Sequence, residues 1–173
     1  PLINKYSIMK KLFFSLCLLG LTIQAYAQIT VLPEVSITAN YKYLNAFNSE
    51  DMPEGVKVLR EEVALYDLKH SEIFLDEYDT YFVSFFIPEG KILAAYNKDG
   101  ILLRTIEKFK DVKLPKDVRN SVLNKYPGWT ITKDIYKVSY HHEKGVTKEQ
   151  FEIKLKNDDK TIRTKVDIDG NFM

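Results

Sequence analysis

Cysteine is almost absent from this chain. Its 173 residues include one cysteine, Cys17, which lies inside a hydrophobic run near the N-terminus. If the chain is cleaved after that run, no cysteine is left in the remaining domain. Disulfides are then excluded as a source of its stability, and a cysteine nucleophile is excluded as a source of catalysis.

Other catalytic patterns are missing too. No serine lies in a Gly-x-Ser-x-Gly elbow, and the 7 glycines form no glycine-rich phosphate loop. Histidine is scarce, and the pair His141-His142 would point to opposite faces of a strand, too far apart to share a metal. We therefore expect no catalytic residue, no cofactor and no metal site.

An excess of one charge is also lacking. The chain has 25 Lys and Arg against 24 Asp and Glu. The part after residue 27 loses three lysines and carries 22 basic residues against 24 acidic ones. Without a strong positive field, nucleic acid and anionic membrane surfaces are not expected ligands.

The first feature that the sequence does contain is an export signal. Two lysines at 10–11 precede an apolar run over 12–21, and Ala25 and Ala27 stand at the −3 and −1 positions before Gln28. The run is too short for the roughly 20 residues of a membrane-spanning helix. We expect residues 1–27 to be a signal peptide cleaved between Ala27 and Gln28, and the product to be periplasmic or secreted, with no membrane span.

The start of the chain carries two further expectations. Met9 is the better translation start, which makes residues 1–8 an upstream artefact. Cys17 follows Leu16, where a lipoprotein signal needs a small residue, so lipidation is not expected.

Two stretches of the chain align without a gap at an offset of seventy residues. The aligned pairs are 81–85 with 151–155, Ile92, Ala94 and Tyr96 with Ile162, Thr164 and Val166, and Asp99-Gly100 with Asp169-Gly170. Apolar positions and turn residues keep register although identity is low. We interpret them as two copies of one unit; chance agreement between ordinary hairpins is the alternative.

Alternation of apolar and polar residues predicts the strands of each copy, and Asp-Gly pairs predict tight turns. Apolar spacing after Pro53 and Pro115 predicts a helix before each set of strands. The predicted class is α+β: a tandem repeat of helix plus antiparallel β-hairpins, with the helices packed on one face of the sheet. The expected domain covers 53–173, with repeats over about 53–110 and 111–173, and residues 28–52 form an N-terminal arm or edge strand.

The first copy departs from the second on its outward face. Glu152, Lys154 and Lys156 make that face charged in the second copy, whereas Phe82, Ser84 and Phe86 occupy it in the first. Exposed aromatic side chains are common anchors of protein interfaces. We therefore select Phe82, Ser84 and Phe86 as candidate partner-binding residues. The alternative is that another part of the chain covers them as a second core.

Four motifs together resemble the PepSY-like domains, also described as β-lactamase-inhibitor-like, of proteins secreted by Bacteroidetes-type bacteria. They are Leu114-Pro115 before a helix, the run 126–129 (Tyr-Pro-Gly-Trp), the strand 151–155 and the closing segment 166–172. The resemblance covers about residues 80–173. It implies tandem α-then-β units and a non-enzymatic binding or inhibitory role in the periplasm, with no defined target.

The functional expectation is a secreted or periplasmic binding module, an inhibitor of or partner for another extracytoplasmic protein. The alternative is a carrier of a small ligand or peptide held between helix and sheet. The tyrosine-rich run Tyr136, Val138 and Tyr140 is the sequence feature behind that alternative.

Overall fold

The structure is a computed structural model in which residues 40–47 and 53–173 are described. The chain divides into two compact units, Pro1–Val31 and Leu32–Met173, and all described residues belong to the second. The predicted signal peptide, its cleavage site at Ala27 and Gln28, and most of the predicted arm at 28–52 lie outside the described residues.

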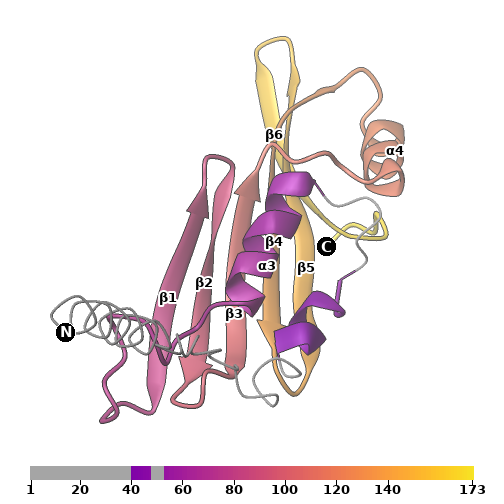
Figure 1. Ribbon diagram of the computed structural model, residues 1–173. Helices are drawn as coiled ribbons and strands as arrows, with labels where there is room; N and C mark the ends of the chain where they lie inside the picture. Colours follow the sequence, from indigo (N-terminus) through magenta and orange to yellow (C-terminus); the bar gives the residue numbers. More distant parts are fainter. Residues whose placement is uncertain (1–39, 48–52) are drawn as a thin grey trace, which may run out of the picture. The chain divides into compact units, whose positions relative to one another are not determined.

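Six antiparallel strands form one sheet in chain order, β1-β2-β3-β4-β5-β6 (Figure 1). The strands are β1 Thr80–Ile87, β2 Gly90–Asn97, β3 Leu102–Lys110, β4 Thr130–His141, β5 Gly145–Asn157 and β6 Lys160–Asp167. Together with the helices, this sheet makes the fold α+β. That both helices cover one face of the sheet as parts of a repeated unit stays a prediction.

The β1–β2 and β5–β6 hairpins have the same register at an offset of 70 positions. Tyr81 pairs with Tyr96, and Phe151 pairs with Val166. The turns that follow also agree: the Asn97 side chain accepts hydrogen bonds from the backbone N–H groups of residues 99 and 101, and the Asp167 side chain accepts them from those of 169 and 171. The helices do not keep this offset, so the complete repeat with its helices stays a prediction.

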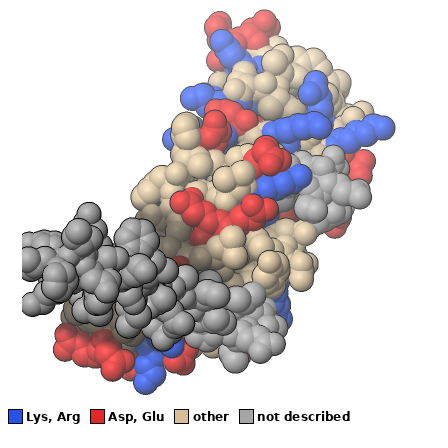
Figure 2. Space-filling view, viewed as in Figure 1, with Lys and Arg blue, Asp and Glu red and all other residues tan. Residues whose placement is uncertain are grey.

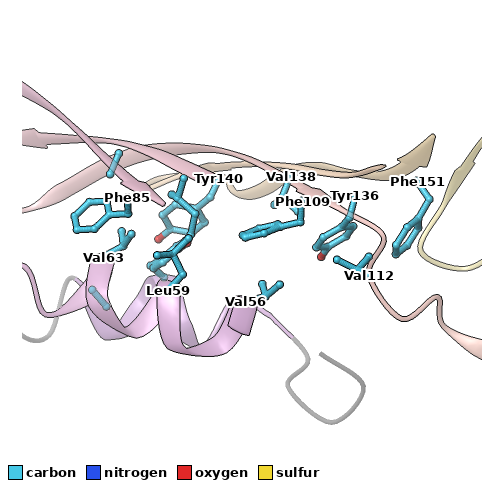
Figure 3. Close-up of a cluster of buried hydrophobic side chains, with 14 of the residues drawn as sticks. Val56, Leu59, Val63, Phe85, Phe109, Val112, Tyr136, Val138, Tyr140 and Phe151 are labelled. Carbon is cyan, nitrogen blue, oxygen red and sulfur yellow. The ribbon is translucent and has the colours of Figure 1, made fainter. Parts of the chain in front are cut away.

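Helix α3, Glu54–Ala64, lies over one face of the sheet, which we call the inner face (Figures 1 and 3). Its apolar residues recur at helical spacing, so Val56, Leu59 and Val63 point together toward the sheet. Phe85 and Phe109 are among the strand side chains that meet them (Figure 3). This contact forms the main core of the described domain.

Helix α4, Lys116–Lys125, connects β3 to β4. Pro115 precedes it, and Gly128 follows it with a φ of 80° that suits glycine. Val118 and Val122 join the core. The turn at Gly170 lies directly against the helix: a Cβ atom added to Gly170 would come within 2.7 Å of the Ser121 hydroxyl oxygen. Helix α4 is thus fixed to the C-terminal turn.

Two features differ from the sequence prediction. The pattern of residues 129–132 and 135–140 predicts two separate strands, but both segments lie in or next to the single strand β4, which absorbs a bulge between Ile131 and Lys133. The sequence pattern of β3 does not predict a strand, because each of its two faces mixes apolar and charged residues. One face has an isoleucine beside basic residues, and the other has a phenylalanine beside a glutamate.

A buried ion pair joins α3 to the sheet. The Arg60 guanidinium lies 2.8 Å from a Glu107 carboxylate oxygen, with both side chains almost fully buried. Tyr43, from the short helical segment 40–44, and Thr105 donate hydrogen bonds to the other carboxylate oxygen at 2.7 and 2.9 Å. Burial and the nearby Glu107 raise the pKa of Tyr43 well above its usual value, so its hydroxyl stays a donor.

Candidate functional site

The candidate site lies on the side of β1, β2 and β3 that points away from α3, at the positions where these three strands pair with one another, which we call the outer face. Side chains alternate along a strand, so Phe82 and Phe86 point away from the inner-face residues Tyr81 and Phe85. The outer face comprises Phe82, Ser84, Phe86, Lys91, Leu93, Ala95, Arg104, Ile106 and Lys108.

The aromatic side chains selected from the sequence are exposed. Phe82 is 57% exposed and Phe86 is 67% exposed, and Ser84 between them is exposed as well. Leu93 and Ile106, 37% and 56% exposed, lie beside them on the neighbouring strands. The second-core alternative is therefore wrong for these side chains, and four large apolar residues share one exposed face.

The register orders the outer face into three rows across the strands. The first row is Phe82, Ala95 and Arg104, the second Ser84, Leu93 and Ile106, and the third Phe86, Lys91 and Lys108. In the first row the Arg104 guanidinium carbon lies 5.6 Å from the centre of the Phe82 ring, over a buried Ala95. This cation–π contact fixes one aromatic anchor without hiding it.

The charge of the outer face is entirely positive. Its charged residues are Lys91, Arg104 and Lys108, and none of them makes an ion pair within residues 40–47 and 53–173. Lys91 lies directly across from Lys108 on the neighbouring strand. Like charges in that position repel each other and weaken the pairing of β2 with β3. A negatively charged partner bound to this face would relieve that repulsion.

The third row of positive charge is neutralised where it reaches β4. Lys137 on β4 lies opposite Lys108, but its ammonium group is 2.9 Å from a Glu152 carboxylate oxygen on β5. The hydrogen bond from Lys137 lowers the pKa of Glu152, which keeps this carboxylate ionised. Along this row, Lys91 and Lys108 are therefore the basic residues without an ion pair in the described part of the chain, and they lie next to the exposed aromatic residues.

Sequence reasoning missed the contributions of β2 and β3 to this site. Leu93, Ile106 and the three basic residues are separated from Phe82 by up to 26 positions and meet it only through strand pairing. The available signal was the alternation of Arg104, Ile106 and Lys108, which indicates one shared face but not which neighbours that face has.

The residues behind the ligand-carrier alternative have a different role. Tyr136, Val138 and Tyr140 are buried in the core next to α3 rather than around an open space (Figure 3). A cavity of about 670 Å³ lies elsewhere, between the segment leading into α4 and the beginning of β4. Trp129, Ile131 and Asp134 line it together with the basic residues Lys113, Lys116 and Arg119.

Asp134 is the one buried acidic residue of that cavity. It is 7% exposed and accepts a hydrogen bond from the backbone N–H of Val112 at 3.1 Å. Burial raises its pKa to about 6. Near neutral pH its carboxylate would therefore favour a hydrogen-bond donor over an anion.

His141 lies at the end of β4 and His142 in the turn that follows. Within the described residues, no group of three or more His, Cys, Asp or Glu side chains could hold a metal ion. Within that same part of the chain, no helix has both the length and the apolar character needed to cross a membrane.

The fold and site together define an α+β protein whose single antiparallel sheet packs against α3 on one side and exposes an apolar–basic surface over β1–β3 on the other. No family model matches the chain, and no curated protein matches it either. A similar solved structure is that of a DUF2874 family protein from Bacteroides ovatus, with 11% sequence identity and a TM-score of 0.33, covering 83% of this chain and 86% of that chain.

Proposed function

We propose that this chain is an exported, non-enzymatic binding module whose outer face docks another protein of the extracytoplasmic compartment. The observation that carries the proposal is the exposure of Phe82 and Phe86 beside Leu93 and Ile106. Soluble proteins rarely leave several large apolar side chains together in water unless the surface is used for binding. Aromatic anchors lose little conformational entropy on docking and bury much area.

The PepSY-like resemblance is part of this proposal. It supports a complete tandem repeat with helices on one sheet face, and it favours a binding or inhibitory role over catalysis. The identical register of the two hairpins is consistent with such a repeat. The face that differs between the two copies would then be the one adapted to a target.

Export is the second part of the proposal. The segment 9–27 has the order of charge, apolar run and small residues that signal peptidase recognises. We expect cleavage between Ala27 and Gln28 and a periplasmic or secreted product. The partner is accordingly sought among extracytoplasmic proteins.

A small-ligand or peptide carrier is the second candidate, and the cavity beside α4 is the observation that favours it. Its volume lies within the range of ligand pockets, and Trp129 and Ile131 supply apolar walls. Native mass spectrometry of the protein taken from its own envelope separates the candidates, because a carrier retains a bound mass and a protein-binding module need not.

The test of the main proposal replaces Phe82→Ser and Phe86→Ser together, which removes apolar area without changing charge. Chemical crosslinking in the native envelope, followed by purification and mass spectrometry, should show a protein captured by the unmodified chain. We expect the double variant to lose that capture by at least about tenfold, since two anchors of an interface are removed.

Val58→Ser with Leu65→Ser is the matched control, because these apolar residues are similarly exposed on the other side of the molecule, in α3 and just after it. The control should capture the partner normally, and both variants should keep the circular dichroism and melting temperature of the parent. Undiminished capture by the Phe82 and Phe86 variant would contradict the proposal. A collapse of its fold would show that these side chains are structural.

A further inference from the structure

A loop of fixed shape precedes the outer face in the chain. Residues 71–79 connect the region after α3 to β1 through two tight turns, with backbone hydrogen bonds of 3.2 Å from Phe74 to Ser71 and 3.1 Å from Tyr78 to Leu75. The Tyr81 hydroxyl donates to the Leu75 carbonyl oxygen, and its ring stacks on Phe74 with centroids 5.5 Å apart. We call this segment the acidic loop.

The acidic loop exposes both apolar and negative side chains. Ile73, Leu75 and Tyr78 are 47 to 53% exposed. Its four acidic residues are Glu72, Asp76, Glu77 and Asp79, all exposed, and none of them forms an ion pair within the described residues. Figure 2 shows acidic side chains gathered at the end of the molecule where β1 begins.

The acidic loop and the outer face are complementary. Residues 71–79 contain four acidic residues and no basic one, and the outer face contains three basic residues and no acidic one. Each surface combines its charges with large exposed apolar side chains. Opposite potentials with apolar area between them are the arrangement that protein interfaces use to select and orient a partner.

The two surfaces do not meet within one molecule. The acidic loop is held by Tyr81, an inner-face residue, whereas Phe82 begins the outer face on the other side of β1. Both surfaces remain exposed, as the exposure of Leu75 and Phe82 shows. A contact between them therefore requires two molecules.

We infer that a second copy of this chain docks its acidic loop on the outer face. The inference rests on the proposed function, because it uses the same face and names an occupant for it. An anionic lipid surface would also attract Lys91 and Lys108, but it would repel the acidic loop and leave that loop's apolar residues unpartnered. Self-association and the capture of another protein compete for one face.

Charge reversal on each surface tests this contact in purified protein. The first variant carries Lys91→Glu with Lys108→Glu, and the second carries Asp76→Lys with Glu77→Lys. Sedimentation-velocity centrifugation over a range of concentrations should show association of the parent that weakens as NaCl rises from about 50 mM to about 500 mM. Each variant alone should associate at least about tenfold more weakly, because the first then has two negative surfaces and the second keeps its positive face but has a loop without net charge.

Mixing the two variants gives the decisive result. The unchanged loop of the first variant then meets the unchanged face of the second, which is the contact of the parent. Association should therefore return in the equimolar mixture to near the parent's strength. Lys156→Glu with Lys160→Glu, at exposed positions near the β5–β6 turn, is the control with the same change in net charge as the first variant and should associate like the parent.

Specific outcomes overturn the inference. A parent that stays monomeric at low salt overturns it. Association that neither reversal weakens, or that mixing fails to restore, overturns it as well. Binding to phosphatidylglycerol vesicles without self-association assigns the face to lipid and also overturns it. If Phe82→Ser with Phe86→Ser abolishes capture of an envelope protein while the charge reversals change no association, the inference fails and the proposed function stands. Unchanged capture by that Phe variant rejects the proposed function itself, whatever the charge reversals show.

Discussion

At the scale of single residues, the burial of Ile106 and Glu107 is the reverse of what is usual for an apolar and an acidic side chain. Ile106 is exposed on the outer face, while the neighbouring Glu107 is 1% exposed within the core. Glu107 is tolerated there because Arg60 neutralises it and Tyr43 and Thr105 donate hydrogen bonds to it. A buried charge is stable only when it is paired and its oxygens are satisfied.

The first prediction concerns this buried pair. Glu107→Leu should lower the free energy of unfolding by about 3 kcal/mol or more, because it leaves the Arg60 charge buried without its carboxylate. Adding Arg60→Leu should recover part of that loss, since an apolar pair needs no charge compensation. Urea unfolding followed by circular dichroism measures both values.

Ile106→Ala is the control for this experiment. Its side chain lies on the exposed face of the same strand, so we expect a cost below about 1 kcal/mol. A Glu107→Leu variant no less stable than Ile106→Ala would show that the buried pair does not hold α3 to the sheet.

At the scale of elements, the hairpins depend on close approach between neighbouring strands. Gly90 begins β2 and pairs with Phe109 on β3. A Cβ at Gly90 would lie 2.3 Å from the Lys108 carbonyl oxygen and 2.8 Å from the Phe109 Cα atom. Backbone atoms cannot rotate away as a side chain can, so the two strands would have to separate.

Gly90→Ala should therefore destabilise the protein by about 3 kcal/mol, as expected for overpacking that shifts the backbone. Gly145→Ala is the matched variant at the start of β5. Gly145 has a φ of 71°, but a Cβ added to it would meet no heavy atom within 4 Å, so only the backbone strain of about 1 kcal/mol is expected. Thermal unfolding of both variants provides the comparison, and equal losses would contradict the steric explanation.

The paired hairpins also show how far local sequence rules reach. Asn97 and Asp167 are different residues, yet each accepts hydrogen bonds from the two backbone N–H groups at the same offsets. A short polar side chain followed three residues later by glycine is enough to form this turn. The helices α3 and α4 follow a different spacing, because each is positioned by the part of the core that it covers rather than by the hairpins.

At the scale of the whole molecule, one hydrophobic core connects all the named elements. It includes Val56 of α3, Phe85 of β1, Val122 of α4 and Val166 of β6. The predicted repeats at 53–110 and 111–173 do not have separate cores among the described residues. A single core makes cooperative unfolding the expected behaviour.

The corresponding prediction uses Trp129, the only tryptophan of the chain. Its fluorescence reports on the end of the molecule near α4, while far-UV circular dichroism reports on the sheet as a whole. We expect both signals to give the same urea midpoint and slope, because the core links the two regions. An earlier transition in fluorescence would show that the second repeat unfolds independently.

The sequence predicted more of the fold than of the site. Alternation predicted strands at 81–85 and 151–155, and proline followed by helical spacing predicted both helices. It also placed Phe82 and Phe86 on the face opposite Tyr81. It could not find Lys91, Arg104 and Lys108 as their neighbours, because strand register across a sheet depends on pairings between distant residues.

The sequence by itself determined which side chains of β1 share a face, since the alternation of a strand is a local property of the backbone. Only the tertiary structure decided that this face is exposed, that three basic residues surround it and that Glu107 rather than Ile106 enters the core. These outcomes depend on which surfaces α3 and the neighbouring strands cover. Burial and charge pairing are properties of the assembled sheet, and no single segment of the chain specifies them.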